Sequence, residues 1–525
     1  MKRRDFIQVG AAGLAGCASY QLLAEQAIVP SIHSGELSIQ EIQSLMDAGK
    51  ITSVSLTKRY LKRIEELDPK LNSILEINPD ALIIAEKMDQ ARKKDGPISA
   101  LHGIPILIKG NIDTMDRMSS SAGSLALAGV FAKKDAHLVH LLRRAGAVLL
   151  GKTNLSEWAN FRSTRSSSGW SSQGGQTHNP YSLDRTPCGS SSGSGVAAAA
   201  ELCAAAIGTE TDGSVVCPSG INGIVGIKPT IGLVSRSGII PLSHSQDTAG
   251  PMARTVSDAA TLLTIITGQD EGDQATVNKN HGVDYASFLV PGKLQGARIG
   301  VASQFLNFHD QVDIAFERAV KDLKEAGATI IDPVTFENTK AMGDDEYTVL
   351  LYEFKHDLNN YLEASNAPEN VNTMAKLIEF NRKNKAAVMP WFQQEIFEMA
   401  QMKGPLTDEA YLKALENCKK FSQTEGIDRV IKEENLDAII APTNGPAWKI
   451  DLVNGDHFLG GSSSMAAVSG YPSITVPMGF VSDLPIGISF FGKAFSEGRL
   501  IELAFSYEQL TKHRKSPEYK DSVDL

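Results

Sequence analysis

Short apolar runs that are typical of buried strands occur near both ends of this chain, and helical sequence lies between them. Each run is bounded by proline or glycine or by polar residues, and the runs cover residues 105–110, 148–150, 438–442, 473–477 and 485–492. In the first third of the chain such strands alternate with helical segments, which favours an α/β sheet covered by helices on both faces. Strands contributed from both ends indicate one large domain, although 525 residues leave room for three at about 150 residues each.

The expected helices begin and end at recognisable signals. Ser38-Ile39-Gln40-Glu41 forms a capping box and starts an amphipathic helix over 38–48. A second helix is predicted over about 55–67, and we expect it to stop before Asp68-Pro69. Further helices are expected over 135–144 and over the alanine-rich segment 196–206. The charged segment 335–436 is predicted to be helical and to shape the substrate pocket as a lid over the sheet.

Composition excludes several classes of protein. The chain holds 51 Lys and Arg against 61 Asp and Glu, a formal net charge of −10, so a phosphate-coated nucleic-acid partner is not expected. Hydrophobic residues make up 42% and charged residues 21%, which suits a globular protein with a large core. The chain has no uncharged apolar run long enough to span a bilayer.

The N-terminus has the pattern of a targeting segment. Lys2-Arg3-Arg4 is followed by a weakly apolar stretch over 9–16, and the start is similar to the twin-arginine export motif. Leu14-Ala15-Gly16-Cys17 is similar to a bacterial lipobox, in which Cys17 carries a lipid. We therefore predict an export signal over 1–25, an envelope or periplasmic enzyme over 30–525, and a membrane contact only through Cys17. A frayed basic helix is the alternative.

Neither the cysteines nor the histidines predict a metal or a disulfide framework. The chain lacks a CxxC or HExxH pattern, and the pair His137 and His140 has no third ligand nearby. We expect no metal and no cofactor. The cysteines are read as small packed residues; they are Cys17, Cys188, Cys203, Cys217 and Cys418.

Two clusters of small residues flank the alanine-rich helix. Residues 188–195 read Cys-Gly-Ser-Ser-Ser-Gly-Ser-Gly and open the helix, where backbone amides could bind an anion or simply pack tightly. The Gly-Lys-Ser/Thr ending of a P-loop is absent, so nucleotide binding is not indicated. Residues 208–214 read Gly-Thr-Glu-Thr-Asp-Gly-Ser, which places Ser214 after a tight turn. A helix and a return turn can bring Ser190 and Ser214 together.

These motifs and their order resemble the amidase signature family. The likeness runs from Asp-Arg-Thr-Pro-Cys-Gly-Ser-Ser-Ser-Gly-Ser-Gly at 184–195 through Thr-Asp-Gly-Ser at 211–214 to Gly-Ile-Lys-Pro-Thr at 226–230. It continues with Gln-Asp-Thr-Ala-Gly-Pro-Met-Ala-Arg at 246–254 and covers nearly all of residues 35–515. The wording of 208–218 is most similar to the bacterial peptide amidases. The resemblance implies the amidase signature fold, a single large α/β domain with a mixed central sheet.

The resemblance also implies the roles of individual residues. Ser214 matches the nucleophile, Ser190 the bridging serine on a cis peptide bond, Lys109 the lysine of a Ser-Ser-Lys triad, and Thr211, Asp212, Gly213 and Ser214 the amides of the oxyanion hole. The pairs Cys188-Gly189 and Asp212-Gly213 depart from the glycine pairs of many members, and the peptide amidases share both departures. The apolar run before Lys109 suits a buried lysine, whose pKa burial can lower far enough for it to act as a base.

Several alternatives stay open at the level of residues. Lys152 could brace the site, and Lys228, before a proline, is expected on a surface turn. His244 with Asp247 suggests a Ser-His-Asp esterase, although the pair lacks a recognisable triad context. Trp170 either lines a pocket or anchors a loop.

The expected activity is release of ammonia from a carboxamide through an acyl-enzyme on Ser214, with the C-terminal amide of a peptide as the expected substrate. Alternatives are other small aliphatic or aryl amides, and the glutamine amidase subunit of a tRNA-dependent amidotransferase. A different class is a non-catalytic protein that holds peptides in the serine-rich cleft.

Overall fold

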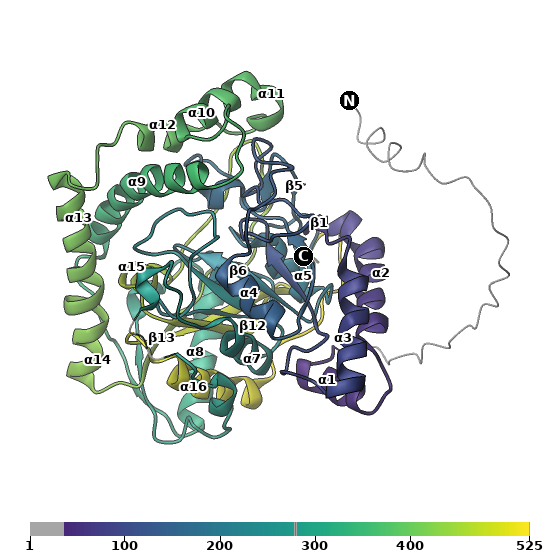
Figure 1. Ribbon diagram of the computed structural model, residues 1–525. Helices are drawn as coiled ribbons and strands as arrows, with labels where there is room; N and C mark the ends of the chain where they lie inside the picture. Colours follow the sequence, from purple (N-terminus) through teal and green to yellow (C-terminus); the bar gives the residue numbers. More distant parts are fainter. Residues whose placement is uncertain (1–35, 278, 280, 524–525) are drawn as a thin grey trace, which may run out of the picture. The chain divides into compact units, whose positions relative to one another are not determined.

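The computed structural model describes residues 36–277, 279 and 281–523, and Figure 1 shows its elements in chain order. Residues Leu37–Leu525 form one compact unit. The export signal expected over 1–25, with Cys17, lies outside the described residues. Within the described part, the search for a helix of sufficient length and hydropathy to cross a membrane finds none.

A sheet of eleven strands runs through the unit, in the order β1-β3-β2-β6-β8-β7-β12-β13-β11-β9-β10. Its strands are β1 (Ile74–Ile77), β2 (Pro105–Lys109), β3 (Val148–Thr153), β6 (Ala205–Glu210), β7 (Val225–Lys228), β8 (Thr248–Ala253), β9 (Arg298–Val301), β10 (Thr329–Ile331), β11 (Ala438–Pro442), β12 (Ser473–Val481) and β13 (Leu484–Phe491). β4 (Trp170–Ser171) and β5 (Gly175–Gln176) pair separately. Strands from both ends of the chain share one sheet, as the sequence predicts.

The sheet is mixed, which confirms the predicted fold class. β2 is parallel to both β3 and β6, whereas β8 is antiparallel to both β6 and β7. Because β2 and β6 run in the same direction, their carboxyl ends meet at one edge of the sheet. Lys109 ends β2 and Glu210 ends β6, so the segments that follow these two strands lie close together.

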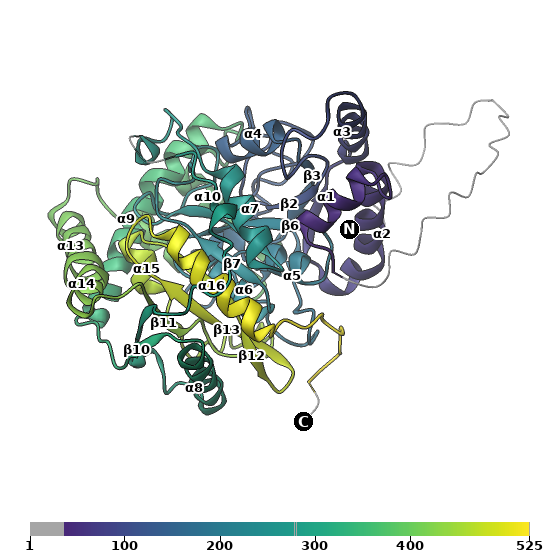
Figure 2. The same ribbon diagram turned by 90° about the horizontal axis from the view of Figure 1, so that it is seen from below.

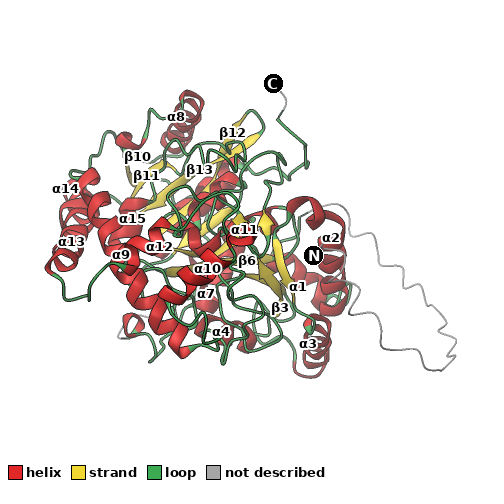
Figure 3. Ribbon diagram, turned by 90° about the horizontal axis from the view of Figure 1, so that it is seen from above, coloured by secondary structure: helices red, strands yellow, loops and turns green. Residues whose placement is uncertain are grey.

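Helices cover both faces of the sheet (Figures 2 and 3). α7 packs against β8 and α16, and α5 and α6 pack against each other and against neighbouring strands. The α-helices are α1 (Ile39–Asp47), α2 (Ser53–Leu71), α3 (Ala81–Asp95), α4 (His137–Arg144), α5 (Ser192–Ala199), α6 (Val216–Ile221), α7 (Val256–Ile266), α8 (Asp310–Glu325), α9 (Thr339–Ala364), α10 (Met374–Lys383), α11 (Lys385–Val388), α12 (Glu395–Gln401), α13 (Glu409–Lys419), α14 (Asp428–Glu434), α15 (Ser464–Ser469) and α16 (Glu497–Thr511). The capping box at Ser38 is present, with the Glu41 N–H donating to Ser38 Oγ.

The segment 335–436 is helical, as predicted, and contains α9 to α14, drawn in green in Figure 1. α9 packs on α12 and α13. Its side chains Leu350 and Phe354 lie in one apolar cluster with Trp158, Phe161 and Phe397. The cluster joins α9 to the polypeptide that follows β3, and thereby holds α9 beside the carboxyl edge of β2 and β6.

Two predicted helices end elsewhere in the structure. α2 continues through Pro69 to Leu71, because Asn72 takes a left-handed conformation that caps the helix and the Asp68 carboxylate accepts the N–H of Ser73 at 2.7 Å. The alanine-rich segment 196–206 is not one helix. It leaves the helix after Ala199, Glu201 adopts φ 57°, and Ala205 begins β6, where small side chains fit between two buried neighbouring strands.

Candidate active site

Lys109 is buried at the carboxyl end of β2, which is buried along its whole length. Its Nζ lies 2.8 Å from Ser190 Oγ, 2.8 Å from Thr209 Oγ1 and 3.1 Å from Thr209 O, and all three contacts are hydrogen bonds. Asn111 Nδ2 donates to the same Thr209 hydroxyl at 3.0 Å. The structure thus brings together two residues that the sequence singles out, Lys109 and Ser190, and adds Thr209, which the sequence analysis did not consider.

The environment of Lys109 favours the neutral amine. Burial lowers the pKa of Lys109 from 10.5 to about 7, and the carboxylates of Asp247 and Glu210 oppose this decrease without cancelling it. A lysine with a pKa near 7 has a large neutral fraction at neutral pH, so Lys109 can accept a proton.

Ser190 is fully buried and directly precedes the start of α5. The Gly189–Ser190 peptide bond is cis, as the family resemblance implied. A side chain at Gly189 would collide with Ser156 Oγ, which explains why glycine stands there. The Ser190 carbonyl accepts the N–H of Ser156 at 3.1 Å, so the loop before α5 is fixed to the segment that follows β3.

Ser214 lies in the tight turn that follows β6. Gly213 has φ +75°, a conformation that side chains rarely adopt. The Ser191 N–H donates to Ser214 O at 3.2 Å, which joins this turn to the loop that carries Ser190. Among the described residues, no hydrogen bond links the Ser190 and Ser214 hydroxyls themselves.

The same turn presents unused backbone donors. Within residues 36–277, 279 and 281–523, the N–H groups of Asp212, Gly213 and Ser214 have no hydrogen-bond acceptor. The Glu210 carboxylate accepts the next two N–H groups, those of Val215 and Val216, at 2.7 and 3.0 Å. Free amides beside a serine hydroxyl are the arrangement that stabilises negative charge on a carbonyl oxygen.

Two cavities adjoin this turn. One of about 280 Å³ is lined by Ala159, Phe161, Thr211, Asp212, Ser214, Leu242, Gly343, Glu346, Tyr347 and Leu350. A second of about 230 Å³ is lined partly by Asn111 and Thr209, the groups around Lys109, and it shares Ala159, Thr211 and Leu242 with the first. Phe161, Leu242, Tyr347 and Leu350 make much of the first cavity apolar.

Cys188 and Cys217 form a disulfide across 29 residues of sequence, so their interpretation as separate packed cysteines is wrong. Cys188 stands two residues before Ser190 and Cys217 three residues after Ser214. The bond therefore ties the two serine-bearing segments together. Their spacing in sequence carries no signal for this pairing, because it depends on the return of the chain through α5 and β6.

The other lysines are also buried. Lys228 ends β7 with no exposed surface, so its expected place on a surface turn is wrong; burial lowers its pKa to about 8 while Glu210, Glu497 and Asp212 oppose the decrease. Lys152 is buried on β3, donates to Ile112 O, and has a pKa lowered by burial to about 8.

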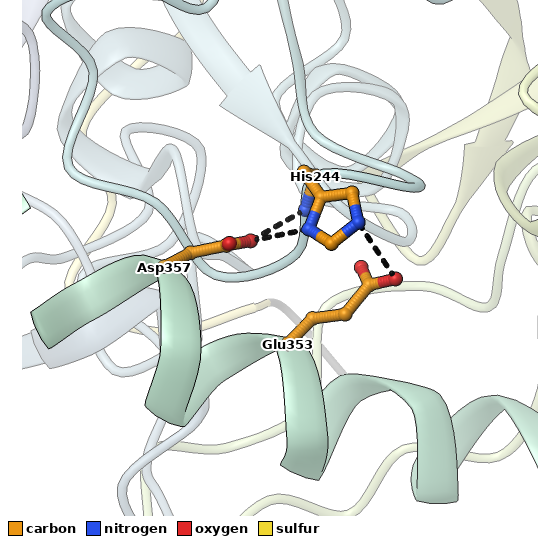
Figure 4. A group of neighbouring side chains, drawn as sticks. All are labelled: His244, Glu353 and Asp357. Atoms are coloured by element: carbon orange, nitrogen blue, oxygen red, sulfur yellow. Dashed lines mark hydrogen bonds and ion pairs between the residues drawn. The ribbon is translucent and has the colours of Figure 1, made fainter. Parts of the chain in front are cut away.

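His244 pairs with carboxylates of α9 and makes no contact with a nucleophile (Figure 4). Its Nδ1 lies 2.9 Å from Asp357 Oδ2 and its Nε2 lies 3.3 Å from Glu353 Oε1. The ligand atoms of these three residues lie within 4.8 Å of one another, close enough to hold a metal ion. The two carboxylates raise the pKa of His244 against the effect of burial, which favours a proton on each ring nitrogen. The predicted partner Asp247 instead accepts Thr211 Oγ1 at 2.6 Å.

Trp170 packs edge-on against Phe392, with ring centroids 5.1 Å apart, and against the Arg162 guanidinium. Its side chain is largely buried and does not line either cavity beside Ser214. Trp170 is therefore a packed anchor of the serine-rich loop.

Known proteins share these features over nearly the whole chain. The Amidase family model matches residues 55–501. The structure of the native peptide amidase from Stenotrophomonas maltophilia superposes with a TM-score of 0.88 at 47% identity, covering 94% of this chain and 99% of that one. A probable amidase from Arabidopsis thaliana is 40% identical over 95% of this chain and 97% of its own length. A subunit of the glutamyl-tRNA(Gln) amidotransferase of Coxiella burnetii is 32% identical over 92% of this chain and 99% of its own length.

The fold, the serine-rich loop that meets the end of β2 and the extent of these matches agree with one another. The chain belongs to the amidase signature family and is an enzyme that hydrolyses amide C–N bonds.

Proposed function

We propose that this enzyme removes ammonia from the C-terminal amide of peptides, through an acyl-enzyme on Ser214 with Ser190 and Lys109 as its proton relay. The observation that carries the proposal is the hydrogen bond between Lys109 Nζ and Ser190 Oγ, made by a buried lysine whose pKa is about 7. The similarity to a peptide amidase supports the choice of substrate.

The relay follows from the contacts of Lys109. A neutral amine has two N–H groups and one lone pair, so Lys109 can donate to Thr209 O and Thr209 Oγ1 and accept the hydroxyl proton of Ser190. Ser190 then takes the proton of Ser214 as Ser214 Oγ bonds to the carbonyl carbon of the substrate. The contact between the two hydroxyls tightens when substrate fills the cavity, as catalytic hydrogen bonds commonly do.

Collapse of the tetrahedral intermediate breaks the C–N bond, and the relay returns its proton to the departing nitrogen, which leaves as ammonia. Water then attacks the acyl-enzyme by the same route and releases the free carboxylate. The free amides at 212–214, with Thr211, would hold the oxyanion. Loss of one such donor typically costs about 10² to 10³ in rate.

The cavity of about 280 Å³ next to Ser214 suits the acyl side of the substrate, and its apolar lining from α9 would accept an uncharged side chain. The segment 335–436 then has the substrate-shaping role expected of it, since Tyr347 and Leu350 belong to it.

Ammonia release from N-acetylated dipeptide amides tests the activity. Ser214→Ala should lower kcat by roughly 10⁴ or more, because removal of a triad member leaves only residual catalysis. Ser219→Ala is the matched control: Ser219 is also buried, follows Ser214 by five residues, and its hydroxyl has no hydrogen-bond partner among the described residues. Full activity of Ser214→Ala would refute the assignment of the nucleophile.

The similarity to an amidotransferase favours a second candidate, hydrolysis of free glutamine to glutamate and ammonia. Glutamine, amino-acid amides and aryl amides should therefore be compared with peptide amides at equal concentration. A kcat/KM that is highest for glutamine would favour the amidotransferase alternative. Binding of peptide amides without turnover would favour the non-catalytic alternative.

We also propose that the enzyme is exported, with a twin-arginine signal and a lipid on Cys17. The Cys188–Cys217 disulfide supports this, because disulfides persist mainly in oxidising compartments. In a bacterial host, Arg3→Lys with Arg4→Lys should retain the full chain in the cytoplasm. Cys17→Ala should release it from the membrane fraction, and unchanged membrane association would refute the anchor.

A further inference from the structure

Glu346 reaches the turn that carries Ser214 from the first half of α9. Its side chain is 8% exposed and lines the same cavity of about 280 Å³ as Ser214 and Asp212. Its Oε1 accepts Gln246 Nε2 at 2.8 Å, and the same Nε2 donates to Thr211 O at 3.2 Å. Glu346 is also hydrogen-bonded directly to the Asp212 carboxyl group. One residue of α9 therefore contacts Asp212 directly and Thr211 through Gln246.

Asp212 is the buried centre of this arrangement. Its two oxygens accept hydrogen bonds from Ser463 Oγ and, at 2.7 Å, from Ser464 Oγ, both beside the start of α15. Glu346 supplies a third contact from α9. Asp212 thus fixes the turn 211–214 to two helices that are distant in sequence, and its backbone N–H is one of the free amides beside Ser214.

Two carboxyl groups can share a hydrogen bond only when one of them holds a proton. Glu346 Oε1 accepts from Gln246, which leaves its second oxygen for the proton directed at Asp212. Asp212 is the natural acceptor because two serine hydroxyls already donate to it. Burial and the negative charge of Asp212 both raise the pKa of Glu346 well above its ordinary value, in agreement with this placement.

We propose that Glu346 is a positioning residue for the amide hydrolysis: as a neutral carboxylic acid it donates a hydrogen bond to Asp212 and holds the turn 211–214 in the shape that aims its free amides at the substrate carbonyl. The proposal rests on the proposed role of that turn as the oxyanion hole. Glu346 acts through Asp212 and does not touch the reacting atoms.

The proposal makes catalysis depend on one proton. When pH rises through the pKa of Glu346, two carboxylates face each other in a buried space and repel, so the turn moves and kcat falls. The other titratable groups that face the pair are Lys228 and Glu210, at the ends of β7 and β6 near Asp212, and Cys418 on α13 near Glu346. The acid side of the pH profile belongs to Lys109 and is independent of Glu346.

Glu346→Gln and Glu346→Leu separate the donor from the bulk of the side chain. The glutamine amide can donate to Asp212 and accept from Gln246 at every pH, whereas leucine does neither. Asp345→Asn is the matched control, since it makes the same carboxyl-to-amide change one residue earlier on α9, away from the cavity. The measurement is kcat and KM against pH from 5 to 10 for the purified full chain, with a thermal melt of each variant.

We expect Glu346→Gln to stay within about threefold of the parent at pH 7 and to lose the alkaline fall of kcat, while Asp345→Asn keeps it. Glu346→Leu should lower kcat by about 10- to 100-fold, in the range of an impaired oxyanion hole, with less change in KM. An unchanged alkaline fall in Glu346→Gln, or equal impairment of Glu346→Gln and Glu346→Leu, overturns the proposal. So does full activity of Glu346→Leu.

The test does not depend on the natural substrate. If the parent enzyme releases no ammonia from peptide amides, the proposed substrate is wrong, and the same pH comparison is made on an aryl amide that it does hydrolyse. Failure of the substrate assignment and failure of the Glu346 assignment are then distinct results.

Discussion

The lowered pKa of Lys109 predicts the acid side of the pH–rate profile. At the ordinary lysine pKa of 10.5, about one amine in 3,000 is neutral at pH 7, whereas at a pKa of about 7 the fraction is about one half. Burial therefore raises the population of the base by roughly 10³. We expect kcat to increase about tenfold per pH unit below pH 6 and to level off above about pH 7.5.

Lys109→Met and Lys152→Met test the origin of this limb. Lys109→Met removes the base and should lower kcat by at least 10²- to 10⁴-fold at every pH, so that the limb disappears. Lys152 pairs with Ile108 on the neighbouring strand and is equally buried, so Lys152→Met controls for loss of a buried charge. Its limb should keep the midpoint of the parent. A parent kcat that is constant from pH 5.5 to 7.5, or that rises only near pH 10, would refute the reasoning.

Three further predictions concern stability. The double variant Cys188→Ser/Cys217→Ser should lose about 3 kcal/mol of unfolding free energy in denaturant titrations, because the disulfide closes a loop of 29 residues in the unfolded chain; a loss below 1 kcal/mol would contradict this. Gly213→Ala should cost about 1–2 kcal/mol and lower kcat, since φ +75° strains alanine and its Cβ would lie 3.0 Å from Ser463 Oγ; an unchanged melting temperature would argue against the turn as described. His244→Ala should lower the melting temperature at pH 6 and much less at pH 9. The raised pKa of His244 means that its ion pairs with Asp357 and Glu353 stabilise the fold fully below pH 6.5 and lose this effect as pH rises through the folded pKa. Equal effects at both pH values would be inconsistent with this.

Local sequence predicted the parts of the site that depend on local structure. The apolar run that ends at Lys109 is a buried strand, and Ser214 follows a turn that requires glycine. The resemblance added the cis bond before Ser190. The strand at Ala205 was missed because alanine favours helices in isolation, while here a narrow space between β2 and β8 selects it.

Contacts between distant segments account for the rest. Cys188 meets Cys217 only after the chain has turned back through α5 and β6, and Lys228 is buried only because β7 lies between β8 and β12. Glu346 reads as one more acidic residue of a charged helix until α9 packs beside the turn at Asp212. In each case the sequence near the residue is ordinary, and the partner that gives it a role is far away along the chain.

Burial alone does not choose among the three buried lysines, because the pKa values of Lys152 and Lys228 are also lowered, to about 8. Their partners differ. Lys152 donates to Ile112 O, and Lys228 donates to Pro229 O and faces carboxylates, so both meet groups that only accept hydrogen bonds. A base needs a neighbour with a proton to give. Lys109 is bonded to the hydroxyl of Ser190, which the Ser191–Ser214 backbone contact holds beside the proposed nucleophile. The chemistry of the partner, and not the depth of burial, assigns the role of base to Lys109.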